Sequence, residues 1–133
     1  MSILVYSGKE GMHGKEILSA VREGFPGRKI VSVKGIEDLR DRFGRPLWDL
    51  DCVVMLLSSR DELDELFSVR EFICNMPVIM IAPDSRPETL SIAHRFYPRF
   101  VTSPEHGFNE VVLVLEKMLD RAEGRKTAQQ GAV

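Results

Sequence analysis

Five short apolar runs alternate along this chain with five runs whose apolar residues recur at helical spacing. Strands that alternate with helices in this way build a parallel sheet with helices on both faces, joined by right-handed crossovers. The third run, Cys52–Leu57, has six consecutive apolar residues, which is typical of a strand covered on both faces. The expected strands are Ile3–Tyr6, Lys29–Val33, Cys52–Leu57, Val78–Ala82 and Arg99–Thr102.

This alternation predicts the α/β class, as a flavodoxin-like (βα)5 three-layer sandwich with the parallel strand order 2-1-3-4-5. Residues Ser59–Glu62 and Ser85–Glu88 each have the sequence of a capping box. Ser103-Pro104 has the order of an N-cap followed by proline at the first helical position. The expected helices run from about His13 to Glu23, Ile36 to Phe43, Ser59 to Ile73, Ser85 to Phe96 and Ser103 to Ala122.

Length and charge narrow the functional classes. We expect one domain at residues 1–122 and a flexible tail at residues 123–133, which are polar or small. A net charge of −2, from 18 basic and 20 acidic residues, gives no electrostatic footprint for nucleic acid. No apolar run approaches the roughly 20 residues of a membrane helix. Cys52 and Cys74 are not clustered, which predicts free thiols in a reducing compartment, so we expect a cytoplasmic protein. From the charge and the apolar runs, we expect it to bind neither nucleic acid nor a membrane.

The tips of the expected strands have almost no catalytic chemistry, although the functional crevice of an open α/β sheet lies at these carboxyl ends. The tips are Ser7-Gly8, Lys34-Gly35, Ser58-Ser59, Pro83-Asp84 and Ser103-Pro104. They offer neither paired carboxylates nor a nucleophile beside a base. His13, His94 and His106 share no metal-ligand spacing. The sequence predicts a binding or signalling module that is not an enzyme and uses no metal or cofactor.

Four stretches resemble the receiver domain of response regulators, and the likeness extends from Ile3 to about Ala122. The stretches are Ile3–Gly8, Trp48–Leu57, Pro77–Ala82 and Arg99–Pro104. In a receiver, a histidine kinase donates a phosphoryl group to an aspartate at the third strand tip, and two acids at the first strand tip hold Mg²⁺. A hydroxyl on the fourth strand and a lysine on the fifth bind the phosphoryl oxygens.

The resemblance places these five reactive positions on residues without the required chemistry. The two acids correspond to Ser7 and Gly8, the acceptor aspartate to Leu56, the hydroxyl to Ala82 and the lysine to Ser103. Mg²⁺ prefers carboxylate oxygens, and leucine cannot form an acyl phosphate. The family's proline is retained at Pro104, and its switch aromatic corresponds to Phe100. The resemblance therefore implies a pseudo-receiver, a degenerate receiver domain that lacks the phosphoacceptor aspartate.

The glycine-rich stretch Gly8–Gly14 supports an alternative from another functional class. A helix N-terminus after such a loop has free N–H groups that can hold an anion. The stretch departs from a Walker A loop, because five residues separate Gly8 from Gly14 and Glu16 replaces the final hydroxyl residue. The alternative is a small anion- or nucleotide-binding domain. Its candidate ligand residues are Gly8, Lys9, Gly11 and Gly14.

Apolar residues off the core stripes predict an interaction surface. At 100° per residue, Leu90, Ala93 and Tyr97 share the core side of the fourth expected helix. Ile92 and Phe96 point away from this side, and Leu113 points away from the core stripe of the last helix. Together with Phe100 on the fifth strand, they are the expected interface residues. Receivers commonly dimerise through this face, so we expect a homodimer. The leading hypothesis is a phosphorylation-independent, receiver-like regulatory protein of two-component signal transduction that acts on a protein partner, such as a kinase, regulator or effector.

Overall fold

A computed structural model describes residues 2–8, 13–45 and 50–131 of the chain. Its centre is a five-stranded, wholly parallel sheet with the order β2-β1-β3-β4-β5. The strands are β1 (Ser2–Ser7), β2 (Lys29–Lys34), β3 (Leu50–Leu56), β4 (Val78–Ile81) and β5 (Phe100–Thr102). The predicted fold class and strand order are therefore confirmed.

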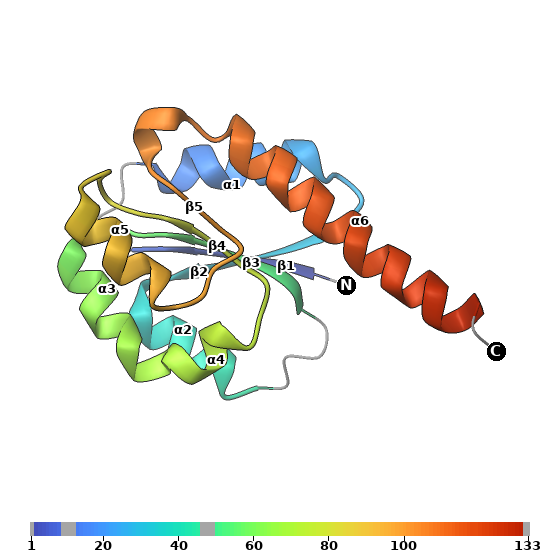
Figure 1. The fold of residues 1–133 in the computed structure, drawn as a ribbon, viewed down its shortest axis with the longest axis horizontal. Coiled ribbons are helices and arrows are strands. Elements are labelled where there is room, and N and C mark those ends of the chain that lie inside the picture. Colours follow the sequence, from blue (N-terminus) through green and yellow to red (C-terminus); the bar gives the residue numbers. More distant parts are fainter. Residues whose placement is uncertain (1, 9–12, 46–49, 132–133) are drawn as a thin grey trace.

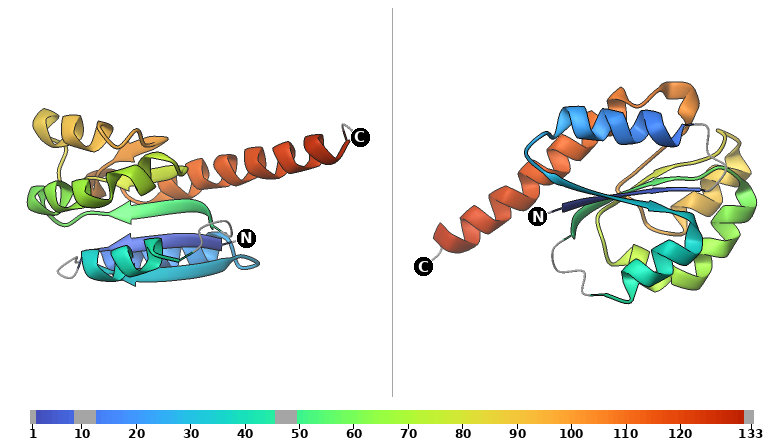
Figure 2. Two further views of the ribbon diagram at one scale, coloured as in Figure 1. Left: turned by 90° about the horizontal axis from the view of Figure 1, so that it is seen from below. Right: turned by 180° about the vertical axis from the view of Figure 1, so that it is seen from behind.

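Helices cover both faces of the sheet, as Figures 1 and 2 show. One face packs against α1 (Gly14–Gly24) and α6 (Asn109–Gly131). The other packs against α2 (Gly35–Phe43), α3 (Arg60–Leu66), α4 (Arg70–Cys74) and α5 (Pro87–His94). Two short 3₁₀ helices, η1 (Phe67–Val69) and η2 (Pro104–His106), complete the described elements. None of the described helices is both long and apolar enough to span a bilayer.

Alternating side chains on the strands divide the core into two layers. On β3, Val53 and Met55 belong to the cluster under α2–α5, whereas Val54 and Leu56 belong to the cluster under α1 and α6. All four side chains are buried, which confirms the prediction of a central strand covered on both faces. Cys52 on the same strand is a free, buried thiol, and burial raises its pKa to about 12. The second cysteine, Cys74, is also free and is half-buried.

The predicted N-cap of the first capping box is confirmed, but the Glu62 side chain bonds Ser58 and not the Ser59 N–H that would complete the box. The Ser59 hydroxyl oxygen accepts a hydrogen bond from the Glu62 backbone N–H at 3.3 Å, so Ser59 caps α3 as expected. The Ser85 box is wrong, because α5 begins at Pro87 and Ser85 Oγ instead donates to the Glu105 carboxylate. In the turn before α5, Asp84 Oδ1 accepts a hydrogen bond from the Arg86 backbone N–H at 2.9 Å.

The predicted third helix is broken into α3, η1 and α4. Ser68 Oγ donates a hydrogen bond to the Glu65 carbonyl at 2.9 Å. This side-chain bond competes with the backbone N–H that would otherwise bond the carbonyl in a continuous helix. Val69 has φ −116°, outside the helical region, and α4 starts after it. A serine within an apolar periodic run can therefore interrupt a helix that the apolar period alone would continue.

The last helix also differs from the prediction at both ends. Ser103-Pro104 opens the short η2 turn, and its serine makes no side-chain cap bond. Gly107 then adopts φ +72°, a left-handed conformation that favours glycine, and redirects the chain into α6. At the other end, α6 continues to Gly131, past the predicted end of the helix at about Ala122. Figure 2 shows this end of α6 extending beyond the sheet.

The orientations predicted for Phe96 and Tyr97 are reversed in the structure. Helix α5 ends at His94, so helical periodicity no longer applies to the two aromatic residues that follow it. Phe96 is fully buried and its ring lies 4.9 Å from that of Phe67. Tyr97 adopts φ 52° and is 70% exposed. Phe96 is therefore a core residue, and Tyr97 lies at the surface.

Candidate functional site

The carboxyl edge of the sheet brings together all five positions to which the receiver resemblance assigns chemistry. Ser7 and Leu56 are the last residues of β1 and β3, and they lie side by side in the strand register. Gly8 follows β1, Ala82 follows β4 and Ser103 follows β5. The Ala82 N–H donates to the Thr102 carbonyl at 2.7 Å, which holds the ends of β4 and β5 together.

The strand-end positions that correspond to the receiver's acidic cluster, Ser7, Gly8 and Leu56, are buried and have no carboxylate of their own. Leu56 is only 3% exposed and belongs to the core layer under α1 and α6. Ser7, Ala82 and Ser103 are also buried, and Ser103 Oγ has no hydrogen-bond partner. Across residues 2–8, 13–45 and 50–131, no three His, Cys, Asp or Glu side chains are grouped to share a metal ion. The residues at the receiver's Mg²⁺ position supply no carboxylate, so they do not fit that cation.

A glutamate that sequence reasoning treated only as a helix cap lies at this edge. Glu62 Oε2 accepts a hydrogen bond from Ser58 Oγ at 2.9 Å. A Cβ atom at Gly8 would collide with both the Glu62 carboxyl group and the Ser58 hydroxyl group. Glycine at this position therefore leaves room for a carboxyl group that comes from α3, a helix more than fifty positions later in the chain. The capping-box sequence located Glu62 on its helix, but gave no sign of its contact with Gly8.

Glu62 lines an acidic cavity of about 410 Å³ on the α2 and α3 side of the sheet. The described residues that line it include three glutamates and no basic residue. They are Tyr6, Gly35, Ile36, Glu37, Ser58, Ser59, Glu62 and Glu65. The cavity therefore disfavours an anion at this part of the carboxyl edge.

Burial perturbs the acid–base chemistry of this cavity. Loss of solvent raises the pKa of Glu62 above its ordinary value of 4.5, and hydrogen bonds from Ser58 and Tyr6 offset part of this increase. Burial also raises the pKa of the Tyr6 phenol, and the neighbouring Glu62 charge raises it further. Tyr6 thus stays protonated at neutral pH and can donate to Glu62.

Replacing Glu62 with glutamine should raise the melting temperature, and the gain should grow with pH. The pKa of Glu62 is higher in the folded state than its unfolded value of 4.5. The fold therefore loses stability as the pH rises from about 4.5 through the folded-state pKa of Glu62. Glutamine does not ionise. The measurement is the melting-temperature difference between Glu62→Gln and the wild type at about pH 4.5 and about pH 8.

Asp64→Asn is the matched control, because Asp64 is an exposed acid of the same helix that is not among the residues lining the cavity. Its effect should not increase with pH in the same way. A Glu62→Gln effect that is equal at both pH values would contradict the proposed penalty on Glu62 ionisation.

The predicted ligand loop is described only in part. Gly8 and Gly14 are placed, whereas Lys9 and Gly11 lie outside the described residues. Gly14 begins α1, and His13 precedes it without making a side-chain cap bond. The Glu62 carboxyl group next to Gly8 would repel an anion held over this loop.

The predicted interface residues do not form one exposed apolar surface. Phe96 is buried, as described above, and this part of the prediction is wrong. Ile92 and Phe100 are half-buried and pack against opposite core layers. Leu113 is 57% exposed, as expected.

No family model matches the chain, and a search of the curated proteins found no match. A solved structure does match: the crystal structure of a "putative pilus assembly protein (cpaE)" from Burkholderia thailandensis E264. The two chains are 12% identical, with a TM-score of 0.58. The match covers 90% of this chain and 99% of that chain. At this level of identity, the likeness establishes a shared fold.

Proposed function

We propose that this chain is a receiver-like regulatory module that does not accept a phosphoryl group and acts by binding another protein. The observation that carries the proposal is the buried Leu56 at the end of β3, beside Ser7 on β1. An acyl phosphate needs a carboxylate at that position, together with a cation to neutralise the transferred group. The carboxyl group that lies against Gly8 is that of Glu62, and it is hydrogen-bonded to Ser58.

Treatment with acetyl phosphate and Mg²⁺ should leave the intact mass of the protein unchanged. The positive control is a receiver domain that retains its acceptor aspartate, treated and measured in parallel. A stable adduct of one phosphoryl group on this chain would refute the proposal, and peptide mapping would identify the residue that accepts it.

We further propose that two copies associate through the face formed by α5, β5 and α6. β5 is an edge strand, so one side of its backbone has no neighbouring strand in the sheet. Leu113 on α6 is a large apolar side chain exposed to solvent, and we assign it to this face. Phe96 is excluded from the surface, and Ile92 and Phe100 contribute only their half-exposed parts.

Leu113→Glu should convert the dimer into a monomer while leaving the circular dichroism spectrum unchanged, because a buried charge in an interface is unfavourable. Sedimentation velocity measures the change. Glu116→Leu, an exposed position one turn further along α6, should leave the oligomeric state as it is. A sedimentation coefficient that Leu113→Glu does not alter would count against this face.

A further inference from the structure

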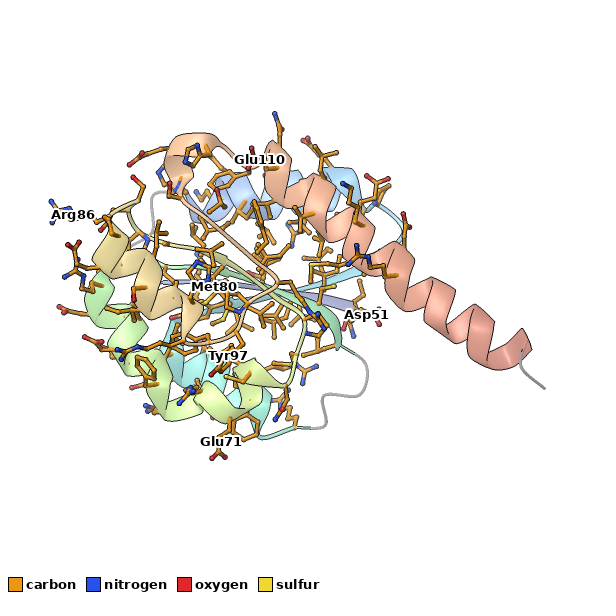
Figure 3. All side chains as sticks on the ribbon, in the orientation of Figure 1. Asp51, Glu71, Met80, Arg86, Tyr97 and Glu110 are labelled. Carbon is orange, nitrogen blue, oxygen red and sulfur yellow. The ribbon has the colours of Figure 1, made fainter. Side chains whose placement is uncertain are left out.

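A second cavity lies at the amino ends of the strands, whereas the acidic cavity lies at their carboxyl ends. It has a volume of about 350 Å³ and lies between α6 and the amino ends of β3, β4 and β5. Figure 3 shows Asp51, at this edge, beneath α6 and far from Arg86 at the carboxyl edge. The lining residues are Asp51, Pro77, Arg99, Val114, Lys117, Met118 and Arg121.

Three cationic side chains converge on this cavity from two elements. Arg99 precedes β5, and Lys117 and Arg121 are one turn apart on α6. No hydrogen bond or ion pair joins any of these three side chains to another described residue. The acidic member of the lining, Asp51, already faces Arg28, with 3.6 Å between Asp51 Oδ2 and the Arg28 guanidinium.

This concentration of positive charge is local. The whole chain has a net charge of −2, and the cavity at the carboxyl edge is lined by three glutamates. Lys117 and Arg121 are four residues apart on α6, a spacing at which like charges on a helix are unfavourable. An anion bound between these residues and Arg99 would relieve the repulsion and gain charge-assisted hydrogen bonds.

Part of the cavity lining is apolar. Val114, Met118 and Pro77 are half-buried and form its uncharged lining. The volume falls within the range of roughly 300–1,000 Å³ that is usual for small-molecule sites. A ligand that suits both parts has several negative charges next to an apolar group.

We propose that this cavity binds a nucleoside diphosphate or triphosphate. The phosphates contact Arg99, Lys117 and Arg121, and the base or sugar packs on Val114 and Met118. The site is separate from the carboxyl edge, so it does not depend on the absence of phosphoryl transfer there. It also differs from the Gly8–Gly14 loop, where Glu62 would oppose an anion.

Isothermal titration calorimetry with ADP, adenosine and pyrophosphate tests the proposal. ADP should bind, pyrophosphate should bind more weakly, and adenosine should give no measurable heat. Arg99→Ala and Arg121→Ala should each weaken ADP binding roughly ten-fold, which is the usual effect of losing a hydrogen bond to a charged group. Lys117→Ala should weaken it to a similar degree, and all three positions are exposed, so the variants should fold.

Arg86→Ala is the matched control, because it removes one exposed arginine at the other end of the molecule. It should change ADP affinity less than two-fold. The proposal is overturned if the Kd of ADP is above about 1 mM, a typical limit for weak ligands. It is also overturned if Arg99→Ala and Arg121→Ala bind ADP as the wild type does, or if pyrophosphate binds as tightly as ADP.

Discussion

Phe96→Ala is expected to lower the free energy of unfolding by about 3–5 kcal/mol. The Phe96 side chain is fully buried in the layer under α2–α5 and packs against the ring of Phe67. Its removal loses the transfer free energy of the ring and leaves a cavity that the surrounding side chains fill only in part. Urea denaturation followed by circular dichroism measures the change.

Tyr97→Ala is the matched control for this substitution. The two aromatic residues are adjacent in sequence, but the Tyr97 side chain is 70% exposed, so its loss should cost less than about 1 kcal/mol. The opposite ranking would mean that α5 continues as a helix past His94 and presents Phe96 to the solvent. That outcome would restore Phe96 to the dimer surface expected from the helical period.

Leu56→Asp should lower the free energy of unfolding by at least about 3 kcal/mol, because it places a carboxylate in the apolar layer under α1 and α6. This substitution reinstates the acceptor residue of a receiver at the end of β3. The loss should be smaller at acidic pH, where the new carboxyl group is protonated. Denaturation at about pH 5 and about pH 8 measures both effects.

Leu56→Asn separates the charge from the change of shape. Asparagine has nearly the same size as aspartate, so it should destabilise the fold without the same dependence on pH. A Leu56→Asp variant that is as stable as the wild type and gains a phosphoryl group from acetyl phosphate would show an open, reactive edge. The receiver chemistry would then be lost through one residue, and not through the closure of the whole site.

The positions of the candidate site could be predicted from the sequence through the receiver resemblance, whereas the strand pattern alone placed the tip of the third strand at Ser58-Ser59. Ser7 and Leu56 terminate β1 and β3, and Ala82 and Ser103 directly follow β4 and β5. Parallel strands bring their carboxyl ends to one edge, so correct strand ends and strand order are sufficient to group these residues. Missing carboxylates at those positions are likewise visible in the sequence.

The charged features of both edges could not be predicted in this way. Glu62 on α3 contacts Gly8 after β1, and the cavity at Arg99 lies between the residue before β5 and α6. In each case the partners are on different elements, and their meeting depends on how a helix crosses the sheet. Sequence periodicity describes one face of one element and contains no information on that crossing.

The sequence by itself predicted the α/β class, the five strands and their order, and it places residues other than those a receiver requires at the corresponding strand ends. These follow from apolar periodicity and residue type, which act within short segments. Only the tertiary structure decided that Phe96 is buried and Tyr97 exposed, and that acidic and basic cavities lie at opposite edges of the sheet. The physical reason is that helix ends and contacts between elements depend on packing between residues distant in sequence, which local patterns do not specify.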